Sequence, residues 1–121
     1  MDLRRVQRVS EALREELAEI VAFELSDPRL AAVSVTEVEV TPDLRSAQVR
    51  VLCDEPQREA EVLRALEGAR RFIRRELAAR IRLWRMPELH FLSDRYASAS
   101  GRIDQLLRRI EKDRQKAGGS L

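Results

Sequence analysis

The chain has 121 residues, enough for one domain with a single modest hydrophobic core. Its charged residues (36%) and hydrophobic residues (44%) are typical of a soluble protein, and the formal net charge is only +2. No apolar run is long enough to span a bilayer, and residues 1–14 lack the apolar core of a signal peptide. A single cysteine, Cys53, excludes an internal disulfide, as in a reducing compartment. We therefore expect a cytoplasmic protein.

The first predicted element is an amphipathic helix from Leu3 to Leu25, in which apolar residues recur at intervals of three and four. Its first outward positions are Arg4, Arg5 and Arg8. Cations at a helix N-terminus oppose the helix dipole, so these arginines indicate a binding role. Alternatively, the free N-terminus frays and the unfavourable charge costs nothing. Pro28 ends the helix, because proline cannot continue it.

Two strands follow, Val33–Thr41 and Ala47–Cys53, and a turn at Pro42-Asp43 joins them as a hairpin. The apolar parity of the first strand changes after Val35, which predicts a β-bulge around Thr36-Glu37. The second strand alternates cleanly and places Cys53 in the core as a small apolar residue.

The segment from Glu59 to Arg85 predicts a long helix with one apolar stripe. A straight helix would place Arg80 on that stripe, so either its side chain reaches past the stripe to solvent or the helix bends near Gly68-Ala69, where the backbone is least restricted. We expect the bend. From Arg64 to Arg85 there are eight arginines and two glutamates. Arg70–Arg74 and Arg71–Arg75 are like-charge pairs at i,i+4 spacing, which destabilise an isolated helix.

This arginine-rich face predicts a surface covered by a polyanion. The alternative is a solvated helix face in an arginine-rich protein. We predict that the residues that contact this polyanion are Arg4, Arg5, Arg8, Arg45, Arg71, Arg74, Arg75, Arg80, Arg82 and Arg85.

A short third strand, Met86–Leu92, is expected to run parallel to an earlier strand through a right-handed helical crossover. These elements indicate an α+β architecture with helices on one face of a small sheet, over residues 1–100. The apolar pattern over residues 101–115 predicts a C-terminal amphipathic helix, and the polar composition of residues 116–121 predicts a disordered tail. We expect a monomer. Alternatively, the apolar seam of that last helix mediates dimerisation or docks a partner; it consists of Ile103, Leu106, Leu107 and Ile110.

Catalytic chemistry is not indicated. His90, the only histidine, lies on a predicted strand, and no metal-ligand spacing, phosphate-binding loop or dinucleotide fingerprint is present. We expect no enzyme activity, metal or cofactor. Among the aromatic residues, only Trp84 and Tyr96 are placed to stack on unpaired bases, which favours structured RNA held by shape and backbone.

Four segments, in this order and spacing, resemble the ribosome-binding factor A family. They are Asp27-Pro28-Arg29-Leu30, Thr41-Pro42-Asp43-Leu44 with Ala47 and Val49, Phe72 to Leu77, and Pro87 to Phe91 with Asp94. A weaker fifth consists of Gly101-Arg102-Ile103 with Leu106-Leu107.

The resemblance implies a type II KH-like domain (α-β-β-α-kink-α-β) without the GXXG loop. Residues 68–71 indeed read Gly-Ala-Arg-Arg, and the family's kink corresponds to Ala69. Some members have a glycine two residues later, where this chain has Arg71.

By the same resemblance, the expected function is non-enzymatic. Such proteins bind the immature small (30S) subunit at 16S rRNA and promote its late maturation, including processing of the rRNA 5′ end. The family is also associated with cold adaptation and with a ribosome-biogenesis GTPase that promotes release. The alternatives from other classes are a protein–protein interaction module and a KH-like domain for another structured RNA.

Overall fold

The computed structural model describes residues 3–94. In chain order the elements are helix α1 (Leu3–Glu19), π-helical turn η1 (Ile20–Glu24), 3-10 turn η2 (Pro28–Leu30), strands β1 (Val33–Val40) and β2 (Ser46–Cys53), 3-10 turn η3 (Pro56–Arg58), helices α2 (Glu59–Gly68) and α3 (Arg70–Arg80), and strand β3 (Glu88–Ser93). The predictions for Tyr96, the helix over 101–115 and the tail over 116–121 fall outside the described residues.

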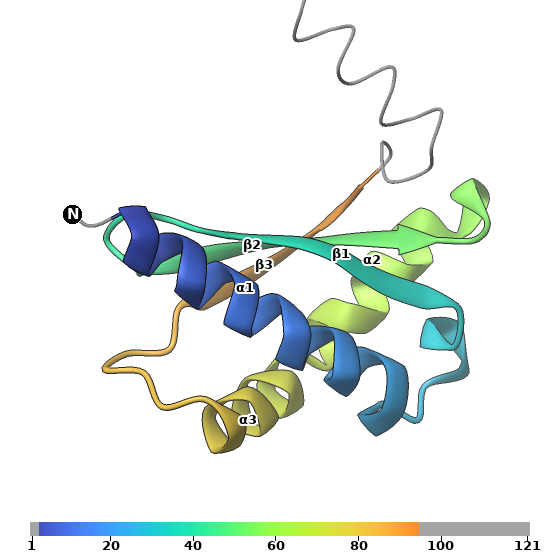
Figure 1. The fold of residues 1–121 in the computed structure, drawn as a ribbon. Helices are drawn as coiled ribbons and strands as arrows, with labels where there is room; N and C mark the ends of the chain where they lie inside the picture. Colours follow the sequence, from blue (N-terminus) through green and yellow to red (C-terminus); the bar gives the residue numbers. More distant parts are fainter. Residues whose placement is uncertain (1–2, 95–121) are drawn as a thin grey trace, which may run out of the picture.

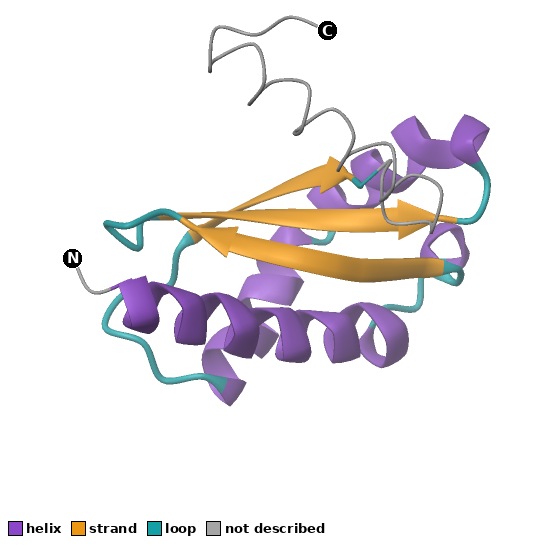
Figure 2. Ribbon diagram, turned by 45° about the horizontal axis from the view of Figure 1, so that its top comes forward, coloured by secondary structure: helices purple, strands orange, loops and turns teal. Residues whose placement is uncertain are grey.

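The strands form one sheet in the order β1-β2-β3. β1 and β2 are antiparallel, whereas β2 and β3 are parallel and pair from Ser46 and Glu88 onward. Helix α1 and the α2–α3 pair lie on the same side of this sheet (Figures 1 and 2). The expected α+β fold is confirmed, and its order of elements is the KH-like α-β-β-α-kink-α-β.

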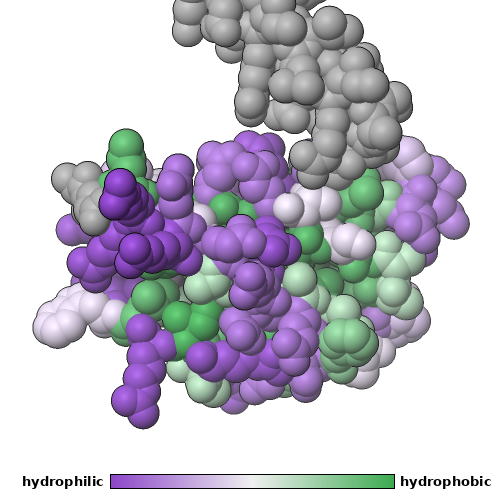
Figure 3. Space-filling model, in the orientation of Figure 1, coloured by the Kyte–Doolittle hydropathy of each residue, from purple (hydrophilic) through white to green (hydrophobic). Residues whose placement is uncertain are grey.

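The core fills the space between the sheet and the helices. Every second residue of β2 from Ala47 to Val51 is buried, and Leu13, Leu17, Leu66 and Ile73 reach it from the helices. This is the pattern that an amphipathic helix on a half-covered sheet requires. On the face shown in Figure 3, the outer side of α1 forms a largely hydrophilic band.

The predicted bulge in β1 is confirmed. Val35 pairs with Val51 and Glu37 with Arg50, which leaves Thr36 as the extra residue. The Thr36 hydroxyl lies 2.6 Å from Asp94 Oδ2 and 3.3 Å from the Arg50 carbonyl oxygen. Asp94 is buried, so its hydrogen bond from Thr36 ties the bulge to the end of β3.

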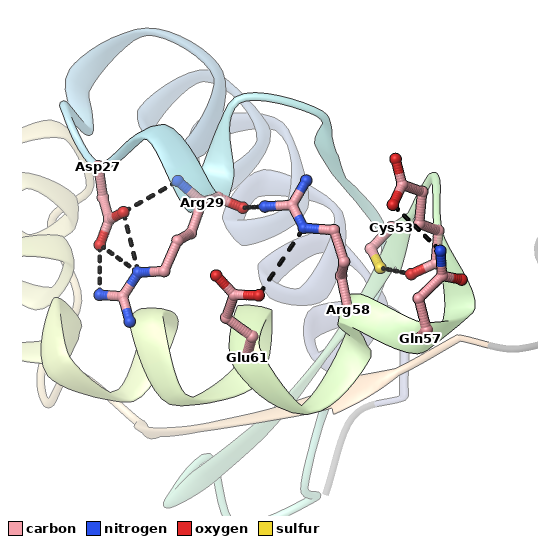
Figure 4. A network of polar contacts seen from close by, with 7 residues as sticks. Asp27, Arg29, Cys53, Gln57, Arg58 and Glu61 are labelled. Atoms are coloured by element: carbon pink, nitrogen blue, oxygen red, sulfur yellow. Dashed lines mark hydrogen bonds and ion pairs between the residues drawn. The ribbon is translucent and has the colours of Figure 1, made fainter.

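The first helix continues to Glu24 rather than Leu25, and its last turn is π-helical. Asp27 then caps η2, since its Oδ1 accepts the Arg29 N–H at 2.9 Å. The Arg29 side chain also donates to Asp27, and this hydrogen bond is the main reason why the pKa of Asp27 lies below its ordinary value. Arg58 reaches the Arg29 carbonyl at 3.3 Å and Glu61 at 3.8 Å, joining η2 to α2 (Figure 4).

Cys53 is half-buried and packs against the edge of the core. Its thiol donates to the Glu55 carbonyl at 3.0 Å, close to the Asp27–Arg58 network (Figure 4). The residue therefore ends β2 as a small apolar side chain with a local hydrogen bond.

The predicted bend is present, and it is centred on Ala69. The backbone there has φ −93° and ψ 0°, and the Ala69 N–H is shared between the carbonyls of Ala65 and Leu66, both at 3.1 Å. Gly68 is the last residue of α2, and a Cβ on it would meet no atom within 4 Å. The special freedom of glycine is therefore not what produces the bend.

The second half of the long predicted helix ends earlier than expected, at Arg80 rather than Arg85. Ile81 is extended, with φ −124° and ψ 127°, and it packs against the core together with Leu83 and Met86. The chain must turn back here to begin β3 beside β2. Residues 81–87 therefore form a loop that carries Arg82 and Arg85. β3 starts at Glu88 rather than Met86, because Pro87 has no N–H to donate to a neighbouring strand.

Arg80 was expected to contact RNA, but its side chain is engaged within the protein. Its guanidinium lies 3.4 Å from Glu16 and from Glu19, 3.3 Å from Glu24 and 4.0 Å from Glu76. Desolvation lowers the pKa of Arg80, but the hydrogen bond to Glu16 and the charges of Glu19 and Glu24 outweigh it and raise that pKa. Arg80 thus joins the end of α3 to α1 and η1, and we leave it out of the candidate binding surface.

We predict that Gly68→Ala increases the free energy of unfolding by about 0.5–1 kcal/mol, because alanine restricts the unfolded chain and fits the helical backbone. Urea denaturation monitored by circular dichroism measures the change. A loss of stability would show that the bend does need glycine at this position.

We predict that Arg80→Gln lowers the urea midpoint, because it leaves four clustered carboxylates without their cation, and that the loss shrinks in high salt. Arg75→Gln is the matched control on the same helix. Within residues 3–94, Arg75 has no carboxylate oxygen within 4.0 Å, so its midpoint should not move. Equal midpoints for the two variants would contradict the prediction.

Candidate RNA-binding surface

Three segments that are far apart in the sequence meet at one end of the sheet. They are the turn between β1 and β2, the loop over 81–87, and the start of α1 (Figure 1). The Glu88 N–H donates to the Arg45 carbonyl at 2.8 Å, which joins the turn to the start of β3. Each segment carries arginine, and α3 adds more along its exposed side.

These arginines line three adjoining hollows. The first, of about 540 Å³, lies between α3 and Met86. The second hollow, of about 530 Å³, shares Arg71, Arg74 and Met86 with the first. The third hollow, of about 370 Å³, shares Arg45 and Arg85 with the second. We call the arginines that line these hollows without an ion pair to any described residue the basic surface; they are Arg5, Arg45, Arg71, Arg74, Arg75 and Arg85.

The turn that presents Arg45 is built from local hydrogen bonds. The Leu44 N–H donates to the Thr41 carbonyl at 2.8 Å, and Asp43 Oδ1 accepts the Thr41 hydroxyl at 2.6 Å and the Arg45 N–H at 3.1 Å. Leu44 has φ 61°, an unfavourable value for a branched side chain that the turn and its partial burial impose. The hydrogen bond from Thr41, followed by that from Arg45, lowers the pKa of Asp43, so this carboxylate is ionised at neutral pH.

Arg70 joins α3 to the strand that follows, and Arg74 makes one long contact with the loop over 81–87. The Arg70 guanidinium donates to the Leu89 carbonyl at 3.2 Å and lies 3.5 Å from Glu67 and 3.9 Å from Glu88. Arg74 reaches the Met86 carbonyl at 3.5 Å. The sequence did not lead us to predict a role for Arg70, although its i,i+3 spacing from Glu67 indicates an ion pair between the two.

The charges of the basic surface are not neutralised from within the described part of the protein. Among residues 3–94, none of its arginines has a carboxylate oxygen within 4.0 Å. Arg14, Arg29, Arg58 and Arg80, in contrast, are each paired with an acid. The fold therefore separates arginines that hold the structure together from arginines that face solvent uncompensated.

Three other predicted site residues line none of these three hollows. Arg4, Arg8 and Arg82 are exposed, on the first turns of α1 and on the loop. Trp84, at the loop tip, is fully exposed and lines the third hollow.

His90 is exposed on β3, and no group of three or more histidine, cysteine or acidic side chains among residues 3–94 is arranged to hold a metal ion. None of the described helices has the length and apolar character needed to cross a membrane. Uncompensated guanidiniums around these hollows are suited to binding phosphate, with two parallel hydrogen bonds per contact.

Known proteins of one family are similar to this chain in sequence. The family model for ribosome-binding factor A matches residues 5–107. Ribosome-binding factor A of Solibacter usitatus is 47% identical over 113 residues, covering 93% of this chain and 92% of the relative.

Solved structures agree with the sequence comparison. The crystal structure of ribosome-binding factor A from Thermus thermophilus is similar with a TM-score of 0.67 and 34% identity, over 73% of this chain and 94% of that one. A Thermus thermophilus homology model fitted into the cryo-EM map of a 30S–RbfA complex has a TM-score of 0.62 and 36% identity, over 74% and 94% of the two chains. The chain described here therefore belongs to the ribosome-binding factor A family.

Proposed function

We propose that this protein is a non-enzymatic assembly factor that binds the immature 30S subunit through 16S rRNA and promotes its late maturation, including processing of the rRNA 5′ end. Family membership supports the proposal, as does the relative fitted into a 30S complex. The observation that carries it is the basic surface, whose arginines have no acidic partner among the described residues.

The chemistry of the surface favours the sugar–phosphate backbone as the ligand. Arginines drawn from α1, the hairpin turn, α3 and the 81–87 loop present guanidiniums along a continuous series of hollows. Phosphate contacts of this kind provide affinity and position without reading sequence. Selection of 16S rRNA then depends on the shape of the folded RNA, as it does in other structured RNA complexes.

Family membership supports a role in binding the small ribosomal subunit, and we propose the rest of the setting with it. The protein acts as a monomer in the cytoplasm, binds without a cofactor, and leaves the subunit when maturation is complete, with a ribosome-biogenesis GTPase promoting release. Its activity is expected to matter most in the cold, where RNA folding is slowest to correct itself.

Reversing two charges tests the surface directly. Arg71→Glu combined with Arg75→Glu should abolish co-sedimentation with immature small subunits, because it changes the local charge by four and introduces repulsion against phosphate. The thermal midpoint should stay near that of the wild type, since both side chains are without a carboxylate partner among the described residues.

The charge-matched control is Arg14→Glu with Arg58→Glu, two arginines that lie outside the hollows and pair with Glu11 and Glu61. It should retain binding despite a modest loss of stability. Survival of binding in the Arg71/Arg75 variant, or its loss in the control at a temperature where both are folded, would mean that the RNA-binding face lies elsewhere.

Salt dependence gives a second, quantitative test. If each arginine of the basic surface neutralises one phosphate, about six counterions are released, and a plot of log Kobs against log salt should have a slope of about −5. Fluorescence anisotropy with a labelled 16S rRNA fragment measures it. A slope near zero would exclude backbone contacts as the source of affinity.

A further inference from the structure

Trp84 is an anomaly in this structure. Its side chain is completely exposed, whereas large aromatic residues in folded proteins are buried for most of their surface. The neighbouring residues show that the exposure is not a property of the whole loop. Leu83 and Met86 are packed against the core, and Pro87 is fully buried. The loop is therefore anchored on both sides of the residue it presents.

The surroundings of Trp84 are cationic. It lines the third hollow, of about 370 Å³, together with Arg5, Arg45 and Arg85. This volume is within the range of small-ligand sites, roughly 300–1,000 Å³. Among the described residues, Asp43 is the one carboxylate that lines this hollow, and its Oδ1 is already hydrogen-bonded by the Thr41 hydroxyl and the Arg45 N–H. The hollow thus offers an aromatic face beside three guanidiniums.

We propose that Trp84 and this hollow form a subsite for one unpaired nucleotide, with the base stacked on the indole and its phosphate held by Arg45 and Arg85. The proposal rests on the assembly-factor function proposed above and adds a contact that phosphate binding alone does not supply. Aromatic residues beside arginine form the stacking platforms of proteins that bind single-stranded RNA, and every base has a face that can stack on them. A regular duplex cannot occupy the subsite, because its bases are already stacked on one another.

The chain contains a single tryptophan, so its intrinsic fluorescence reports on this position alone. The probes are a short single-stranded RNA of mixed sequence and a fully paired, blunt-ended RNA stem formed by two separate strands, with the same number of phosphates. The single-stranded RNA should quench the tryptophan emission on saturation, whereas the paired stem should bind through the arginines without quenching. Absence of quenching by the single-stranded RNA overturns the proposal.

Substitutions separate stacking from charge. Trp84→Ala should weaken binding of the single-stranded RNA about 5- to 100-fold, leave the salt slope unchanged and leave binding of the paired stem unchanged. Trp84→Phe should recover most of the lost affinity. Arg85→Gln should instead reduce the steepness of the salt slope by about 0.7 for the single strand. Wild-type affinity in Trp84→Ala, with an unchanged thermal midpoint, overturns the proposal.

Two controls distinguish the remaining explanations. A polyglutamate chain of matched charge should not quench the emission; equal quenching would show that the hollow responds to negative charge only and would overturn the nucleotide subsite.

Co-sedimentation with immature small subunits distinguishes failure of the proposed function from failure of the proposed nucleotide subsite. Failure of the wild type to bind subunits rejects the assembly-factor function, whereas equal binding by wild type and Trp84→Ala rejects only the stacking contact.

Discussion

The parallel pairing of β3 with β2 is the constraint on which the rest of the structure depends. Parallel neighbours require a crossover connection, and here α2, the bend at Ala69 and α3 provide it. Because β3 must begin beside the start of β2, the chain leaves α3 at Arg80 and returns along the 81–87 loop to the hairpin turn. The convergence of arginines from separate segments is a direct result of this return.

The same packing divides the arginines into two groups. Arg70 and Arg80 reach carboxylates on other elements and hold α3 in place, whereas Arg74 of the basic surface reaches the Met86 carbonyl at 3.5 Å but no carboxylate among the described residues. Arg71 and Arg75 occupy the same helix but reach neither kind of group within residues 3–94, because Ile73 and Leu77 fix the buried side of α3 and leave these positions facing solvent. A single helix therefore carries both structural and uncompensated cations. The separation is geometric, since the residue type is the same.

The bend has a related consequence for the binding surface. A KH-like domain with a GXXG loop would present backbone at this point of the chain, whereas this protein has Gly-Ala-Arg-Arg and passes from α2 to α3 through one non-helical residue. Under the proposed function, side-chain guanidiniums along α3 and the 81–87 loop would take the place of that loop as the groups available to a phosphate backbone. Three adjoining hollows form this surface, which under the proposed function would receive a folded RNA.

The sequence by itself determined the order of elements, the bulge at Thr36, the bend at residues 68–69 and the concentration of arginine, because each follows from local periodicity or local charge. The tertiary structure decided where the long helix ends and what each arginine contacts. Arg80 contacts Glu16, which is 64 residues away in the sequence. Arg45, Arg71 and Arg85 line one hollow only once β3 has paired with β2. Helical spacing describes neighbours within about four residues, so contacts made by folding over longer separations are invisible to it.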